Sequence, residues 1–256
     1  MGFRYLDQIA SRRSIQQFLE LADLALGGTD SAENVFNLSH QLRDSPPMRL
    51  CERVLRRDPA AQALIEQRRP VGPYNLAALK ACAKGTLGHT YAVVMETLQY
   101  DINFFPRPDY FANLETDADY INYRVYATHD IHHIISGFSL DDFGEAGVIS
   151  ISVGQFNHPG LGFTDLVALL MNFLRNDMPD DELTDQRQQI HTASYVFKLI
   201  SDGLNIAARA KPLFPVLWEQ HFDRDLEELR RELGVEPVRE GPFSWYSNPA
   251  IMAALA

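Results

Sequence analysis

Apolar side chains recur along most of the chain at spacings of three and four residues, the period of an α-helix that buries one face. The first such stripe ends before Gly27 and Gly28, a natural stop for a helix, and comprises Ile15, Phe18, Leu19, Ala22 and Leu26. Further stripes lie at residues 35–42, 46–55, 75–83 and 86–100. Pro46 and Pro59 stand where a helix accepts proline, in its first turn. The pattern predicts a mainly helical protein.

Near the C-terminus a regular apolar stripe predicts a helix over residues 218–233, with Gly234 as its stop. The stripe consists of Trp218, Phe222, Leu226, Leu229 and Leu233. The residues from Gly241 onward show no comparable period, so we expect an irregular tail.

One segment carries a strand-like pattern. Val148–Val153 alternates and is rich in β-branched residues, but no partner strand of similar quality lies nearby, so we interpret it as a buried helix. The proline-containing stretch 103–113 is interpreted as a loop rather than a domain boundary. We therefore predict an all-α fold of about ten helices in a single domain that spans residues 1–256.

Composition adds constraints on the compartment. Cys51 and Cys82 are too few for a disulfide framework and indicate buried thiols in a reducing compartment. The N-terminus lacks the apolar run of a secretory signal. The most apolar stretch, Leu166–Leu174, is about half as long as a bilayer-spanning helix. We expect a cytoplasmic protein, or one on the cytoplasmic face of a membrane, with no signal peptide, transit peptide or transmembrane span.

The net charge of −11 is unevenly distributed. Residues 1–86 hold 12 basic and 9 acidic side chains, whereas residues 87–256 hold 11 basic and 25 acidic ones. The acidic part is unsuited to nucleic acid, because phosphate binding needs clustered cations. The basic part would face an anionic membrane, a partner or solvent.

Candidate chemistry is concentrated between residues 129 and 145. His129 and His133 are four residues apart and therefore share one face of a helix, about 40° apart around its axis. Asp130 lies on the flank of that face. Gly137 is a natural helix end, so a tight helix–turn–helix would bring Glu145 back toward the two imidazoles.

Two imidazoles with carboxylates suit zinc, manganese or ferrous iron. Two histidines at this spacing also arise by chance among eight histidines, as ordinary structural or exposed side chains. A metal-dependent hydrolase is a further alternative, since His129-Asp130 is also typical of HD-type phosphohydrolases. That class needs another histidine and aspartate, for which His89 and Asp165 or Asp202 lack a convincing context.

The pattern His129-Asp130-x-x-His133, followed after eleven residues by Glu145, resembles the signature of the coenzyme Q (ubiquinone) biosynthesis protein 4 family. Further matches over about residues 65–165 are Arg69-Pro70, Gly85-Thr86-Leu87-Gly88, Tyr91, Arg124, Gly137 and Gly144. The chain departs from the family at His132, where a tryptophan is usual, and at Tyr123 and Tyr126, which flank Arg124.

The resemblance implies a divalent metal, zinc first, with iron, manganese and magnesium as alternatives. It implies His129, Asp130, His133 and Glu145 as metal ligands and catalytic residues, and Arg124 as a contact for the substrate headgroup. The implied partners are a polyprenyl-tailed aromatic or isoprenoid lipid, a second copy of the chain, other quinone-biosynthesis proteins and a membrane surface. The implied role is oxidative decarboxylation at ring position C1, or a non-catalytic lipid-binding scaffold.

Overall fold

The structure, a computed structural model, describes residues 12–26, 31–104, 114–174 and 192–256. Within these residues the chain forms thirteen α-helices, two 3₁₀ helices and no strand, which confirms the all-α prediction. Short helices raise the number above the expected ten. The α-helices are α2 (Arg12–Leu26), α3 (Ser31–Leu42), α4 (Pro46–Leu55), α5 (Pro59–Gln67), α6 (Leu76–Lys80), α7 (Leu87–Thr97), α8 (Asp117–Ala127), α9 (His129–Ser136), α10 (Asp142–Phe156), α11 (Pro159–Phe173), α13 (Ala193–Arg209), α14 (Leu226–Leu233) and α15 (Pro249–Leu255).

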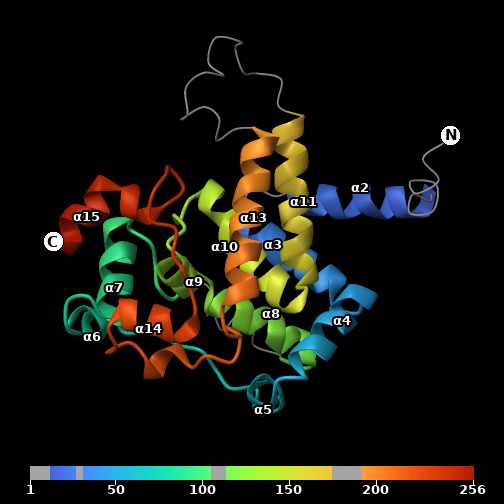
Figure 1. The fold of residues 1–256 in the computed structure, drawn as a ribbon. Coiled ribbons are helices and arrows are strands. Elements are labelled where there is room, and N and C mark those ends of the chain that lie inside the picture. The colour runs from blue at the N-terminus through green and yellow to red at the C-terminus, as the bar shows by residue number, and fades with distance from the viewer. Residues whose placement is uncertain (1–11, 27–30, 105–113, 175–191) are drawn as a thin grey trace, which may run out of the picture.

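Helix α10 forms the centre of the fold and packs on α9, α11 and α13 (Figure 1). Its residues from Ala146 to Ser152 are buried almost without interruption, as expected of a helix that is covered on all sides. Close packing on α13 depends on Gly203, because a Cβ there would lie 2.1 Å from the carbonyl oxygen of Gly147. The interpretation of Val148–Val153 as a buried helix is confirmed.

The predicted helix over residues 218–233 is wrong in its first half. Residues Trp218–Gln220 form the 3₁₀ helix η2, and α14 starts only after Asp225. The Asp225 side chain accepts a hydrogen bond from the Glu228 backbone N–H at 2.9 Å, and this cap starts a new helix. Gly234 ends α14 at a φ of 71°, as predicted.

The expectation of an irregular tail from Gly241 is also wrong. Residues Trp245–Ser247 form the 3₁₀ helix η3, and α15 follows and packs on α7. The Asn248 side chain caps α15 by accepting hydrogen bonds from the backbone N–H groups of Ala250 and Ile251, and Pro249 occupies the first turn. A helix of seven residues is too short to show a clear apolar period. The local signals for it are the capping residue and the proline.

The predicted helices at residues 75–83 and 86–100 exist but are shorter, as α6 and α7. Gly27, Gly28 and most of the predicted loop, residues 105–113, lie outside the described residues. None of the described helices has the length and apolar character needed to cross a bilayer.

A buried carboxyl group joins α10 to α11. Asp165 is 5% exposed, and its Oδ2 lies 2.8 Å from Ser150 Oγ, which is itself 2.7 Å from the carbonyl oxygen of Ala146. Ser150 Oγ donates to Asp165 Oδ2 and also lies within hydrogen-bond distance of the Ala146 carbonyl oxygen, so its one proton is shared between these two acceptors. Burial raises the pKa of Asp165 to about 7, against the opposing effect of the Ser150 hydrogen bond.

We expect Asp165→Asn to stabilise the protein increasingly as the pH rises. The raised pKa means that the folded state binds the proton more tightly, so the unfolding free energy of the wild type falls between about pH 4 and pH 7. An asparagine amide makes the same hydrogen bond without ionising. In urea unfolding, the stability advantage of the variant should grow by about 2–3 kcal/mol between pH 5 and pH 8. Asp202→Asn, on the surface of α13, is the control, and equal pH profiles for wild type and Asp165→Asn would contradict the assignment.

Candidate metal centre

The turn between α9 and α10 depends on Gly137. This residue ends α9 in the left-handed region, with a φ of 83°, and its N–H donates to the carbonyl oxygen of His133 at 2.9 Å. A Cβ at this position would lie 2.2 Å from the carbonyl oxygen of Val238. Both the backbone angle and the space therefore require glycine.

The start of α10 is fixed by Asp141 and Gly144. The Asp141 side chain accepts hydrogen bonds from the Gly144 backbone N–H at 2.9 Å and from Ser139 Oγ at 2.7 Å. The backbones approach so closely that a Cβ at Gly144 would lie 1.8 Å from the carbonyl oxygen of Ser139. This tight start points the first turn of α10, and with it Glu145, back along α9.

The structure brings His129, His133 and Glu145 together as the sequence predicts. Glu145 Oε2 lies 2.8 Å from His129 Nε2, and Glu145 Oε1 lies 3.2 Å from His133 Nε2. The two Nε2 atoms are 3.1 Å apart, with the rings perpendicular at 88°. One ligand atom from each residue lies within 4.8 Å of the others, which makes this group a candidate metal-binding triad.

The protonation of His133 is set by the backbone. Its Nδ1 lies 3.3 Å from the carbonyl oxygen of Phe138, and because a carbonyl can only accept, Nδ1 carries the proton. In the neutral ring Nε2 then presents a lone pair toward His129 Nε2 and Glu145 Oε1. Such a backbone partner is the usual way in which proteins orient a metal-binding imidazole. No sequence pattern could have identified this contact, since any residue at position 138 would offer the same carbonyl.

These contacts are mutually favourable only if a proton or a metal cation lies among them. The Glu145 carboxylate and the His133 Nε2 lone pair face His129 Nε2, so either an N–H on that nitrogen or a metal cation must lie between them. Two imidazoles and a carboxylate form a donor set that divalent transition metals prefer. The residues present therefore fit a metal ion.

The electrostatics of the group agree with this. Burial raises the pKa of Glu145, but the neighbouring His129 and His133 lower it more, and the net result lies well below the ordinary range. For His129 the directions are reversed. Burial lowers its pKa, but the Glu145 carboxylate has the larger effect, so the pKa of His129 is raised. The group thus holds a carboxylate that strongly favours cationic neighbours.

The centre is open on one side. The His133 side chain is fully buried and that of His129 is 10% exposed, whereas the Glu145 side chain is 42% exposed. A cation bound here would be held by two buried imidazoles and one partly exposed carboxylate. An open position is the arrangement that distinguishes catalytic from purely structural metal sites.

Two predicted site residues lie outside the triad. Asp130 is half-buried on the flank of α9, and burial raises its pKa to about 6, although His129 and His133 act in the opposite direction. Arg124 is buried on α8, where its Nε and Nη2 donate to the carbonyl oxygens of Phe214 and Val216 at 2.7 and 2.8 Å. Its guanidinium holds the loop before η2.

Other candidate histidines are also placed. His132 points away from the triad and packs on the Trp218 ring at 5.6 Å, and burial lowers its pKa to about 3, so it is neutral. His89, Asp165 and Asp202, which an HD-type hydrolase would need, do not belong to the triad. Instead, His89 forms a hydrogen bond with the Lys80 carbonyl, Asp165 with Ser150 and Asp202 with Lys198.

Fold and site together define an all-helical protein with a two-histidine, one-carboxylate centre on a helix–turn–helix. The family model described as coenzyme Q (ubiquinone) biosynthesis protein Coq4 matches residues 24–239, and the chain belongs to this family. The match extends well beyond the expected residues 65–165 on both sides.

Relatives agree with this membership. The chain is 31% identical over 229 residues to the mitochondrial ubiquinone biosynthesis protein COQ4 of Clavispora lusitaniae, covering 87% of this chain and 66% of that protein. It is 26% identical over 215 residues to the mitochondrial COQ4 homolog of Aedes aegypti, covering 84% and 68%. The chain thus spans about two thirds of the length of these curated relatives.

A solved structure supports the fold. A crystal structure from Nostoc punctiforme, described as a candidate ubiquinone biosynthesis protein, superposes with a TM-score of 0.68 at 23% sequence identity. The superposition covers 89% of this chain and 100% of that one.

We expect Gly144→Ala to disrupt the centre, because the added methyl group would clash with the Ser139 backbone and displace Glu145. The loss of unfolding free energy should be at least about 3 kcal/mol. The same substitution at Gly162 in α11 would meet only ordinary contacts, at 3.7 Å from Val153, and should change stability by less than about 1 kcal/mol. Urea unfolding of both variants measures the difference, and equal stabilities would show that α9 and α10 are not held this closely.

Proposed function

We propose that the protein acts in ubiquinone-type quinone biosynthesis as a metal-dependent enzyme on a prenylated aromatic intermediate. His129, His133 and Glu145 would hold a divalent metal, with zinc as the first choice and iron, manganese or magnesium as alternatives. The observation that carries the proposal is the convergence of three lone-pair donors at one partly exposed point. Family membership supports a role in ubiquinone biosynthesis, and we infer the substrate class from that role.

When bound, the metal would act as a Lewis acid that stabilises charge on a ring carboxylate or phenolic oxygen. The chain's own residues would prepare this position. His133, oriented by the Phe138 carbonyl, would present Nε2, and Glu145 would supply the negative charge at the open side.

Asp130, half-buried on the flank of α9, would lie beside the three converging ligands rather than among them. The orienting role is already filled for His133 by the Phe138 carbonyl. Arg124 donates to two backbone carbonyls and so contributes to the fold, and its contact with a substrate headgroup stays a prediction.

The proposed reaction replaces the C1 carboxylate of the aromatic ring by a hydroxyl group. The bond from C1 to the carboxyl carbon breaks and carbon dioxide leaves, a bond from C1 to oxygen forms, and the ring carbon loses two electrons. With dioxygen as the oxygen source, one oxygen atom would enter the ring and the other would leave as water, so the reaction would also consume two protons and two electrons from an external reductant. This oxidative route would need iron at the site, because zinc is not redox-active.

The second candidate is a lipid-binding scaffold without turnover, and one surface favours it. Large apolar side chains are exposed on α11 and α13, which lie side by side (Figure 1): Leu166, Met171 and Phe173 on α11, Leu174 after it, and Phe197 and Leu204 on α13. Phe173 is 74% exposed. Exposed apolar side chains of this size suit contact with a prenyl lipid, a membrane surface, a second copy of the chain or another quinone-biosynthesis protein.

The metal proposal predicts about one divalent ion per purified chain. Glu145→Ala and His129→Ala should each lower the metal content after mild dialysis by at least tenfold, because each removes one of three ligands. His40→Ala is the matched control, since His40 is an exposed imidazole on α3. Elemental analysis measures all four proteins. Full metal retention by Glu145→Ala, or none in the wild type, would refute the site.

The two candidate functions differ in what the metal ligands do for a cell. If the protein is an enzyme, His129→Ala should fail to restore ubiquinone in a deficient cell, whereas His40→Ala should restore it. Mass spectrometry of quinone intermediates would then show the ring carboxylate retained. Full rescue by His129→Ala would instead support the scaffold and rule out the catalytic role.

A further inference from the structure

Helix α9 carries both imidazoles, yet it is only eight residues long. A helix of this length is not stable alone in water, and its last four carbonyl oxygens lack partners inside the helix. His133 begins this last stretch. The position of its ring therefore depends on what binds the carbonyls of residues 133–136.

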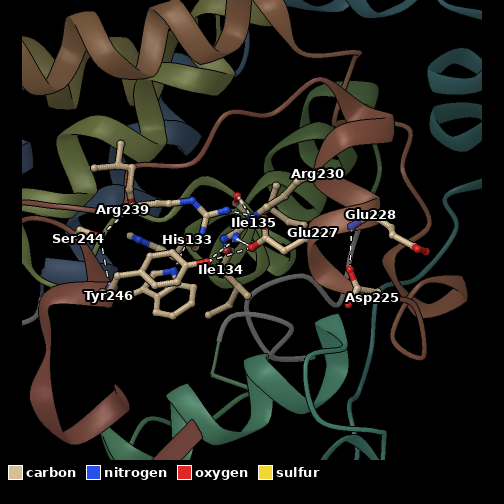
Figure 2. A network of polar contacts seen from close by, with 12 residues as sticks. His133, Ile134, Ile135, Asp225, Glu227, Glu228, Arg230, Arg239, Ser244 and Tyr246 are labelled. Atoms are coloured by element: carbon tan, nitrogen blue, oxygen red, sulfur yellow. Dashed lines mark hydrogen bonds and ion pairs between the residues drawn. The ribbon is translucent and has the colours of Figure 1, made fainter. Parts of the chain in front are cut away.

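Every one of these carbonyls has a partner, mainly from the C-terminal part of the chain, and Figure 2 shows Arg230 with Ile134 and Ile135. Trp245 Nε1 donates to His133 O at 3.1 Å, Arg230 Nη2 to Ile134 O at 2.6 Å, Arg230 Nε to Ile135 O at 2.9 Å, and the Val238 N–H to Ser136 O at 2.8 Å. The bend is held in the same way, because Gly137 O accepts from the Trp245 N–H at 3.1 Å and the Ser139 N–H donates to Phe243 O at 2.7 Å.

Arg230 is suited to this role by charge as well as by shape. It is 1% exposed on α14, and its guanidinium also contacts Glu227 and the Tyr246 hydroxyl. A buried guanidinium is stable only when its donors are used. Placed at the C-terminal end of α9, its charge also balances the negative end of the helix dipole.

Trp245 acts on the ligand residue itself. Its indole N–H binds the carbonyl of His133, which already accepts from Gly137. The other buried tryptophan, Trp218, has no hydrogen-bond partner for its Nε1 among the described residues. Two buried indoles thus flank α9, but only the Trp245 indole donates a hydrogen bond to the backbone of this helix.

We propose that Arg230 and Trp245 are positioning residues for the metal centre. They clamp the last turn of α9 and so keep His133 Nε2 aligned with His129 and Glu145, without touching the metal. This inference rests on the proposed function, because it assigns a purpose to the same triad.

The test compares matched variants of the full chain. Trp245→Phe removes the N–H that binds His133 O, and Trp218→Phe makes the same change without a lost hydrogen bond. Arg230→Lys keeps the charge but loses the pair of hydrogen bonds to Ile134 O and Ile135 O. Arg239→Lys is its control, because Arg239 binds Glu227 but does not reach α9. Zinc dissociation constants are measured by chelator competition, and cobalt-substituted protein reports ligand geometry through its visible spectrum.

We expect Trp245→Phe and Arg230→Lys to weaken zinc binding by about 10- to 100-fold and to change the cobalt spectrum, as is usual when groups behind metal ligands are altered. Both controls should stay within about threefold of the wild type. Unchanged affinity in Trp245→Phe, or an equal loss in Trp218→Phe at equal melting temperature, would overturn the proposal.

Hydrogen exchange on the metal-free protein separates this inference from the proposed function. Faster exchange of the Gly137 amide in Trp245→Phe than in Trp218→Phe supports the clamp, even if the wild type binds no zinc and the proposed function falls. Equal exchange in the two variants overturns the clamp, even if zinc binds normally.

Discussion

The structure depends on an electrostatic requirement at one point, where a carboxylate faces two imidazole nitrogens. Glu145 lies within 3.2 Å of both rings, and the Phe138 carbonyl fixes the His133 proton on the far nitrogen. Lone pairs so arranged repel unless a proton or a metal cation lies among them. The fold must supply enough stability elsewhere to hold these groups together, and the proposed metal would relieve the repulsion.

The surrounding architecture supplies that stability in three layers. Residues 146–152 of α10 are buried without interruption, so this helix cannot shift without disturbing the core. Gly137 and Gly144 allow a bend in which backbones approach more closely than any side chain would permit. The segment from α14 to η3 then covers the end of α9 and binds its carbonyl oxygens. The helix that carries the two histidines is therefore held by residues about a hundred positions further along the chain.

Much of this could be predicted from sequence, and the rest fails for identifiable reasons. The helical period gave the fold class, and the spacing of His129, His133, Gly137 and Glu145 predicted the triad, because all four lie in one local unit. Long-range contacts could not be predicted in this way: Arg230 and Trp245 reach α9 from about a hundred residues away, and nothing near them in the chain indicates it. The two backbone carbonyls that Arg124 binds are likewise distant in sequence, and its contact with a substrate headgroup stays a prediction.

X-ray absorption spectroscopy of the zinc-loaded protein tests the central claim most directly. The account predicts a first shell of two imidazole nitrogens at about 2.0–2.1 Å and at least one carboxylate oxygen, with the imidazole scattering reduced by half in His133→Ala. A shell made only of oxygen, or a spectrum that His133→Ala leaves unchanged, would contradict it.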